Sequence, residues 1–179
     1  MVDQRYVEIA SPYGTLGLCW GEAPAGLRVT RIYLPNQWAA LGSRPLASEV
    51  PGPIVALADQ MRRFLGGEPL PLPRDLLALE ACSAFQRRVL LAEYGVPRGQ
   101  VTTYGRLAAH LGVPGGARAV GGALARNPFP IVIPCHRAVA ADGGLGGFQG
   151  GLTMKRALLE AEGVTLSEGG RVLAAGWCY

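Results

Sequence analysis

The sequence has little of what a metal centre or a membrane protein would need. Its 179 residues include two histidines and four cysteines, and no two cysteines form a CxxC pair. A tetrahedral zinc site would have to gather its ligands from scattered positions, so we expect no bound metal and no cofactor. No apolar run is long enough to span a bilayer, and the first ten residues lack an apolar signal segment. We therefore expect a soluble, cytoplasmic protein without membrane contact.

Lysine is nearly absent, because Lys155 is the only one and arginine supplies the remaining positive charge. Residues 1–79 balance seven arginines against seven acids, whereas residues 80–179 carry ten basic residues against six acids and supply the net charge of +4. Residues 84–137 hold seven arginines and one acid, Glu93. This segment is a candidate surface for DNA or RNA. The alternative is that arginine is simply the favoured base of this chain.

Turn signals divide residues 1–79 into short strands and one helix. The runs RYVEIASPYGTLGLCWGE and GLRVTRIYLP predict an antiparallel sheet of three strands, with strict alternation over residues 27–34. The run PIVALADQMRRFLGG predicts a helix that starts at Pro53 and ends at a glycine pair. The following GEPLPLPRD is typical of a connector. We expect a small α/β domain over residues 1–79 and a more helical domain over residues 80–179.

Helix signals dominate the second half. The run SAFQRRVLLAEYG opens with Ser83 and Gln86 at the spacing of a capping box. TTYGRLAAHLG begins at a threonine cap, GARAVGGALARN follows it, and the GVPG between them is typical of a helix-turn-helix. GLTMKRALLEAEG predicts a final helix that stops at Gly163.

The second helix of this pair has almost no side chains over much of its surface. Ala119, Gly122 and Ala123 are among its small residues. A glycine inside a helix costs about 0.5–1 kcal/mol relative to alanine, so some contact should offset that cost. One explanation is close packing on another helix, and the other is close approach to a narrow surface such as the minor groove of DNA. Arg118 and Arg126 flank the small residues at positions suited to phosphate contact or insertion.

Cys135 and His136 stand side by side after Pro134, where the apolar run IVI predicts a short buried strand. An imidazole can accept a thiol proton and so produce the nucleophilic thiolate. Neighbours in a strand point to opposite faces. Either the chain turns at Cys135, or a water joins the thiol to the imidazole. Glu162 is our choice for the acid that orients the base, although composition does not separate it from Glu160. The alternative is that Cys135 is a buried structural cysteine.

Three segments together resemble the O6-alkylguanine-DNA alkyltransferases, also called methylated-DNA–protein-cysteine methyltransferases. They are RAVGGALARNPFPIVIPCHR, GFQGGLTMKRALLEAEG and the less diagnostic SPYGTLGLCW. The resemblance implies an α+β fold, with a ribonuclease-H-like N-terminal domain and a winged-helix, helix-turn-helix C-terminal domain. It also implies a cofactor-free monomer that binds double-stranded DNA bearing O6-alkylguanine, with O4-alkylthymine as a further substrate. Such a protein flips the nucleotide through the minor groove and transfers the alkyl group to a cysteine once, irreversibly.

The resemblance assigns family roles to single positions. It makes Cys135 the alkyl acceptor, His136 the water-linked base, Glu162 the acid that orients the base, and Tyr104 the proton donor to the leaving guanine. The remaining matches concern DNA and the base pocket. The resemblance makes Arg118 the residue that fills the gap left by the flipped nucleotide, and Asn127 the brace of the recognition helix, which carries Ala119, Gly122, Ala123 and Arg126. It also implies that the carbonyls of Cys135 and Ala138 read the guanine amino group and that Phe148 and Gln149 wall the pocket. Phe148 lacks the hydroxyl of tyrosine-bearing relatives, and Gln149 stands where relatives often have serine.

Other functions fit the residues less well. A lesion-recognition protein that transfers nothing usually has another residue at the cysteine position, and Cys135 is retained here. A Cys-His hydrolase needs an oxyanion hole and usually a histidine distant in sequence. A helix-turn-helix transcription factor needs side chains to read base edges in the major groove, and the nearly bare second helix offers few.

Overall fold

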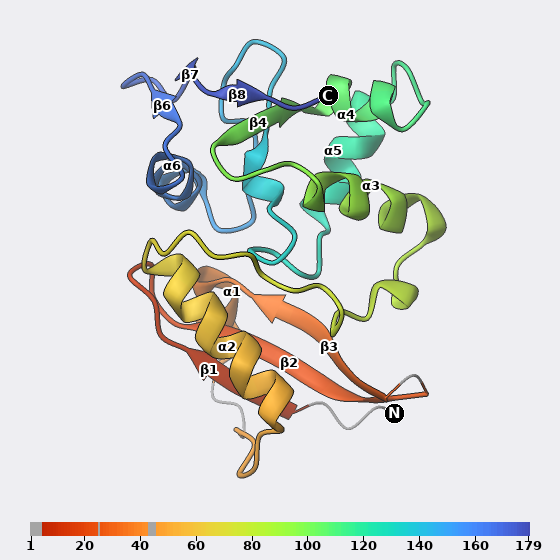
Figure 1. The fold of residues 1–179 in the computed structure, drawn as a ribbon, viewed down its shortest axis with the longest axis vertical. Coiled ribbons are helices and arrows are strands. Elements are labelled where there is room, and N and C mark those ends of the chain that lie inside the picture. Colours follow the sequence, from red (N-terminus) through yellow and green to blue (C-terminus); the bar gives the residue numbers. More distant parts are fainter. Residues whose placement is uncertain (1–4, 25, 43–45) are drawn as a thin grey trace. The chain divides into compact units, whose positions relative to one another are not determined.

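The structure is a computed structural model that describes residues 5–24, 26–42 and 46–179. The chain divides into two compact units, coloured from red to blue along the sequence in Figure 1. None of the helices within the described ranges is long and apolar enough to cross a membrane.

The first unit is built on an antiparallel sheet. Its strands are β1 (Arg5–Ile9), β2 (Leu16–Ala23) and β3 (Gly26–Tyr33), paired in that order. The predicted three-stranded antiparallel sheet is confirmed.

A β-bulge changes which side chains of β3 face inward. Cys19 pairs with Arg31, but its neighbour Trp20 pairs with Val29, so one residue of β3 is left over. The extra residue shifts the alternation of faces, and Val29 and Ile32 are both buried. The strict alternation predicted for this strand is therefore wrong.

Two helices accompany this sheet. Helix α2 (Gly52–Leu65) lies across the sheet, buries an apolar stripe, and ends at the expected glycine, Gly66 (Figure 1). The short α1 (Pro35–Ala40) was not predicted, and it buries Trp38. A Cβ added at Gly17 would lie 2.0 Å from the Trp38 ring, so this glycine is required for the helix to pack on β2.

A later segment, residues 128–132, also belongs to the first unit, although the sequence analysis assigns it to the second domain. The N–H of Ile32 donates to the carbonyl of Pro128 at 2.8 Å, which attaches the segment to β3. Ile131 is buried but has a φ of 76°. The strand predicted from the run IVI does not form, because this left-handed backbone is incompatible with a strand.

The second unit comprises Glu80–Asn127 and Ile133–Tyr179. Its α-helices are α3 (Ala84–Tyr94), α4 (Tyr104–His110), α5 (Ala117–Ala125) and α6 (Leu152–Ala161). A small parallel sheet of order β5-β4-β8 joins Ala138–Val139, Gln100–Thr103 and Gly176–Trp177, while β6 (Thr165–Leu166) pairs antiparallel with β7 (Val172–Ala174). Two 3-10 turns, η1 (Leu79–Ala81) and η2 (Cys135–Arg137), complete the elements.

Side-chain caps begin α3 and α4, and the Gln86 side chain joins α3 to the end of α5. The hydroxyl of Ser83 accepts from the N–H of Gln86 at 3.2 Å, and Thr103 caps α4 in the same way. The reciprocal half of the predicted capping box is wrong. The Gln86 amide instead donates to the carbonyls of Ala123 at 3.2 Å and Arg126 at 3.0 Å, so α3 satisfies the last carbonyls of α5.

Candidate active site

Cys135 is the first residue of η2, so the chain turns at the cysteine itself. The amide of Asn127 donates to its Sγ at 3.2 Å and to the carbonyl of Ile133 at 3.1 Å. Asn127 thus ties the end of α5 to the turn that carries the thiol. Burial raises the pKa of the Cys135 thiol to about 11, although the Asn127 amide opposes the shift. The resting thiol therefore keeps its proton at neutral pH and needs a base.

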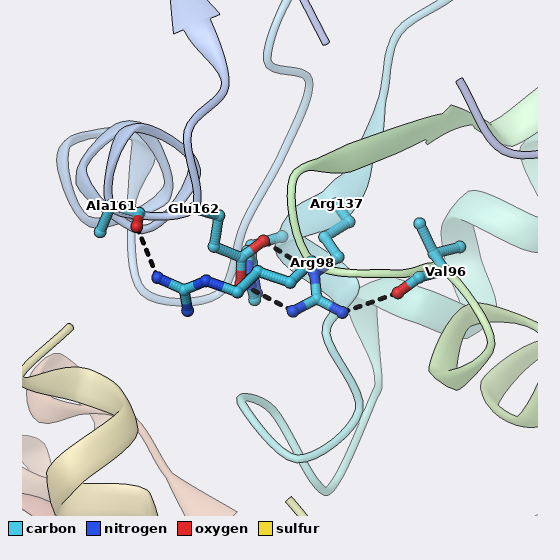
Figure 2. A network of polar contacts seen from close by, with 6 residues as sticks. Val96, Arg98, Arg137, Ala161 and Glu162 are labelled. Carbon is cyan, nitrogen blue, oxygen red and sulfur yellow. Dashed lines mark hydrogen bonds and ion pairs between the residues drawn. The ribbon is translucent and has the colours of Figure 1, made fainter. Parts of the chain in front are cut away.

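The two residues after Cys135 share one carboxylate. His136 Nε2 lies 3.0 Å from Glu162 Oε1, and Arg137 donates to both Glu162 oxygens at 2.8 and 2.7 Å. Figure 2 shows Arg137 reaching from Glu162 to the carbonyl of Val96, a bond of 2.7 Å. Arg98 binds the neighbouring Ala161 carbonyl at 2.5 Å. Glu162, and not the exposed Glu160, is the acid that faces His136.

This network fixes the protonation of the histidine. Burial opposes ionisation of Glu162, but the hydrogen bonds from His136 and Arg137 outweigh it and lower the Glu162 pKa to about 2. An ionised carboxylate accepts, so His136 Nε2 carries the proton. Burial lowers the pKa of His136 despite its bond to Glu162. The ring is therefore neutral, and its basic Nδ1 is buried without a hydrogen-bond partner among the described residues.

Cys135 lies in the wall of a cavity of about 480 Å³. The cavity brings the cysteine together with three more of the predicted site residues and with part of α5; its lining is Tyr104, Gly121, Leu124, Ala125, Cys135, Gly147, Phe148 and Gln149. The Gln149 amide is fixed by a bond of 2.9 Å to the carbonyl of Asn127. Gly146 has a φ of +66°, and a Cβ there would lie 2.8 Å from the Tyr104 hydroxyl. Burial raises the pKa of Tyr104, although a hydrogen bond with the Gly147 N–H opposes the shift, so the phenol keeps its proton.

Ala138 does not line this cavity. Its carbonyl accepts from the ammonium group of Lys155 at 2.6 Å, and the same ammonium donates to the carbonyl of Gly147 at 3.2 Å. Lys155 is fully buried on α6. It links the turn after Cys135 to the loop that walls the cavity. Sequence reasoning missed this role, and the available signal was that Lys155 is the one lysine in an arginine-rich chain.

The small residues of α5 are only partly on its surface. Arg118, Ala119 and Arg126 are exposed and Gly122 is half-buried, but Ala123 is buried, with 1% exposed. The structure therefore does not place Ala123 on an accessible face.

The glycines of α5 are not required by packing inside the protein. A Cβ added at Gly121 would approach no atom closer than 3.8 Å, and one at Gly122 none closer than 3.5 Å. These are ordinary van der Waals distances. Although α5 packs against α3 and α4, close packing on another helix therefore does not explain why Gly121 and Gly122 are glycine.

The arginines of residues 84–137 do not form one uniform basic surface. Arg137 is buried against Glu162, while Arg88 donates to the carbonyl of Leu111 at 2.7 Å. The guanidinium groups of Arg118 and Arg126, in contrast, make no hydrogen bond or ion pair with any residue that the structure describes. The exposed guanidinium groups available to a partner therefore include the two that flank the small residues of α5. Within the same described ranges, no three His, Cys, Asp or Glu side chains gather to hold a metal ion.

Comparison with known proteins places this site in a family. The family model described as 6-O-methylguanine DNA methyltransferase, DNA binding domain, matches residues 84–164. The chain is 46% identical over 158 residues to the methylated-DNA–protein-cysteine methyltransferase of Methanothermobacter thermautotrophicus, covering 87% of this chain and 83% of the relative. It is 38% identical over 162 residues to the Mycobacterium tuberculosis protein of the same name, covering 88% and 92%.

Solved structures agree with the sequence relatives. Mycobacterium tuberculosis OGT in complex with DNA matches with a TM-score of 0.72 at 38% identity, covering 88% of this chain and 92% of that one. The O6-methylguanine-DNA methyltransferase of Pyrococcus kodakaraensis matches with a TM-score of 0.65 at 28% identity, covering 90% and 99%. The mixed α/β architecture is therefore that of these proteins. By sequence and by structure, the chain belongs to the methylated-DNA–protein-cysteine methyltransferase family.

Proposed function

We propose that this protein repairs double-stranded DNA by moving the alkyl group of O6-alkylguanine onto Cys135. The observation that carries the proposal is the cavity that Cys135 shares with Tyr104, Phe148 and the inner residues of α5. A reactive thiol, an aromatic wall and the helix with the free arginines thus meet at one pocket. The names of the relatives, and the DNA bound to one of them, support the same activity.

The chemistry begins with access. A base atom inside a duplex cannot reach a buried thiol, so the nucleotide has to leave the stack and enter the cavity. We infer that α5 enters the minor groove, where Ala119 and Gly122 permit close approach. Arg118 fills the gap in the duplex and Arg126 contacts phosphate. The carbonyl of Cys135 reads the guanine amino group at the pocket, whereas that of Ala138 is bonded to Lys155 and does not face the cavity. O4-alkylthymine is the second substrate.

The transfer is a direct displacement at the alkyl carbon. His136 Nδ1 accepts the thiol proton through a water, which fits a basic, buried nitrogen with no protein partner in the described structure. The Cys135 sulfur then bonds to the alkyl carbon, and the pair of the broken carbon–oxygen bond stays on guanine O6. Tyr104, which keeps its proton, donates it so that guanine leaves neutral. The thioether product is not cleaved by water, so each molecule acts once.

The finer fold and state belong to the same proposal. The first unit is ribonuclease-H-like, which its three antiparallel strands and α2 support. The second unit is a winged-helix domain, which the α4–α5 pair and the adjoining β5-β4-β8 sheet support. The protein acts in the cytoplasm as a monomer. It needs no metal or cofactor, since its own side chains and one water supply every group that the displacement uses.

Mass spectrometry tests the transfer. After incubation with O6-methylguanine duplex, intact mass and peptide mapping should find one methyl group per molecule, on Cys135. Cys135→Ala should gain none, whereas Cys82→Ala, which removes another free cysteine, should react fully. Repeated turnover by one molecule, or transfer by the Cys135→Ala protein, would contradict the proposal.

A second arm tests the role of α5. Arg118→Ala should slow repair of the duplex by about tenfold or more, because extruding a base costs a few kcal/mol, and should leave reaction with free O6-alkylguanine unchanged. Arg87→Ala, on the exposed surface of α3, is the matched control. Equal losses on duplex and free base would show that Arg118 does not stabilise the extruded state.

A further inference from the structure

Glu93 is a buried acid that the proposed transfer does not use. It lies near the end of α3, is 0% exposed, and is the only acid among residues 84–137. Neither of its carboxyl oxygens has a hydrogen-bond partner among the described residues. Leaving a buried polar group unsatisfied is costly. Helix α3 packs against η2, the turn that carries Cys135, so this unsatisfied acid lies on an element in contact with the cysteine turn.

The charges around Glu93 come from several elements. Lys155 on α6 and Arg137 on η2 favour its ionised form, and the Ala138 N–H lies near enough to help slightly without forming a bond. Arg137 is already neutralised by Glu162. Tyr104 on α4 and the C-terminal Tyr179 are also within reach of the Glu93 charge.

Burial decides the outcome for this carboxyl. It outweighs the neighbouring positive charges and raises the Glu93 pKa to about 8. Helix α5 packs against α3, but Arg118 and Arg126 lie on the exposed side of α5, away from the buried Glu93. Glu93 is therefore protonated and uncharged at neutral pH.

Lys155 is the partner through which Glu93 can act on Cys135. Its ammonium group is buried and, among the described residues, donates only to the carbonyls of Ala138 and Gly147. Its positive charge favours the Cys135 thiolate, whereas a negative charge on Glu93 opposes that thiolate. The charge behind the sulfur therefore depends on whether Glu93 holds its proton.

We propose that Glu93 is a positioning residue for alkyl transfer. While Glu93 holds its proton, the positive charge of Lys155 near Cys135 is not compensated and favours the thiolate. Once Glu93 is ionised, its negative charge slows thiolate formation. The inference rests on the proposed function, in which the Cys135 sulfur is the attacking atom. No bond to Glu93 forms or breaks except that to its own proton, which passes to solvent as the pH rises. The carboxyl thus sets the alkaline limit of the reaction.

The expected pH profile follows from these signs. A lone thiol with a pKa of about 11 would gain reactivity about tenfold per pH unit up to that pKa. Here Glu93 gains negative charge near pH 8, and Lys155, whose pKa burial lowers to about 8, loses positive charge in the same range. Both changes disfavour the thiolate, so the wild-type rise should flatten above that pH.

Glu93→Gln separates this effect from the rest of the site, because glutamine has the shape of the protonated acid and never ionises. At about pH 7 its rate should match wild type, and at about pH 9.5 it should exceed wild type by roughly three- to tenfold, the result of a thiol pKa lower by about half to one unit. Glu160→Gln, an exposed acid on α6, should follow wild type throughout. Profiles that superimpose, or an equal loss at both pH values, would overturn the proposal.

Two reactions keep this test apart from the test of function. Modification of Cys135 by iodoacetamide, followed by peptide mapping to distinguish the other cysteines, needs no DNA. Methyl transfer from O6-methylguanine duplex needs the whole function. Divergence with iodoacetamide but no transfer from DNA would refute the proposed function and retain the role of Glu93. Transfer from DNA with superimposed iodoacetamide profiles would do the reverse.

A direct observation covers the case in which Glu93→Gln fails to fold. The infrared carbonyl band of a protonated carboxylic acid should be present in wild type at about pH 7 and vanish above about pH 8. It should be missing from both Glu93→Gln and Glu93→Leu. If wild type shows no such band, Glu93 is ionised at neutral pH and the proposal is wrong.

Discussion

Two buried glutamates of the second unit, Glu162 and Glu93, both lie near Arg137, but their pKa values shift in opposite directions. Glu162 receives hydrogen bonds from His136 and Arg137 and stays ionised, with a pKa of about 2. Glu93 receives no hydrogen bond from Arg137 or Lys155, whose charges act on it only electrostatically, and burial raises its pKa to about 8. A nearby positive charge is therefore not enough to keep a buried carboxyl ionised. Donors aimed at its oxygens decide the outcome.

The difference gives the site two kinds of charge. The Glu162 network is fixed over the whole physiological pH range, and it holds His136 in one tautomer. The Glu93 region changes its charge just above neutral pH. In the proposed mechanism Cys135 is influenced by both, because the tautomer of His136 does not change with pH while the charge near Glu93 does. Each of the following changes removes one member of the contrast.

The largest effect is expected from Glu162→Gln. The substitution leaves the buried Arg137 guanidinium without a counter-charge, and arginine cannot discard its proton. We expect a loss of about 3–5 kcal/mol in the free energy of unfolding, measured by urea denaturation, together with loss of alkyl transfer.

Glu160→Gln is the matched control for this change. Glu160 lies on α6 close to Glu162, but its pair with Arg156 is exposed. Exposed pairs contribute about 0–1 kcal/mol, so the control should stay within that range of wild type. Similar losses in the two variants would mean that the buried network is no more stabilising than a surface pair.

Arg137→Met should have a smaller effect, because Glu162 can respond by taking up a proton. We expect a loss of about 2–3 kcal/mol at neutral pH. In wild type, the depressed pKa of Glu162 gives stability that is present above its ordinary value of 4.5 and is lost as pH falls toward 2. The variant should lose most of this acid-dependent change in urea midpoint. An unchanged acid dependence would show that His136 alone keeps Glu162 ionised.

Glu93→Leu should change stability least, and in the opposite direction. A carboxyl with a raised pKa stabilises the fold fully below its ordinary value of 4.5, and this stability is lost as pH rises through about 8. The variant should lack that decline and be about 1–2 kcal/mol more stable than wild type near pH 8. Parallel pH dependences of the urea midpoint in the two proteins would show that Glu93 titrates as an ordinary surface acid.

Much of the fold could be predicted because its signals are local. Short β-rich runs between turn residues indicated β1 to β3, and the caps at Ser83 and Thr103 indicated α3 and α4. The strands β4 to β8 are too short to show a period. The run IVI had the composition of a strand, but composition does not reveal the left-handed φ of Ile131.

The site was predictable in its reactive residues and not in its buried charges. Cys135 and His136 are adjacent in sequence, and the family resemblance selected Glu162 over Glu160. Glu93 is the one acid among residues 84–137 and Lys155 the one lysine of the chain, but nothing local shows that either side chain is buried. Their burial depends on contacts with other segments, such as the turn at Ala138, 17 residues before Lys155, whose carbonyl receives the Lys155 ammonium.

The open space around Gly121 and Gly122 has a consequence for protein engineering. Alanine fits at both positions without a clash inside the protein, and each replacement should stabilise α5 by about 0.5–1 kcal/mol. A selection for heat resistance alone would therefore favour these alanines. The methyl group at Gly121 would narrow the cavity beside Cys135, and the one at Gly122 would thicken the face of α5 that we propose enters the minor groove. Stability and repair are in conflict at this helix, and a thermostable variant chosen without a repair assay would tend to lose its activity.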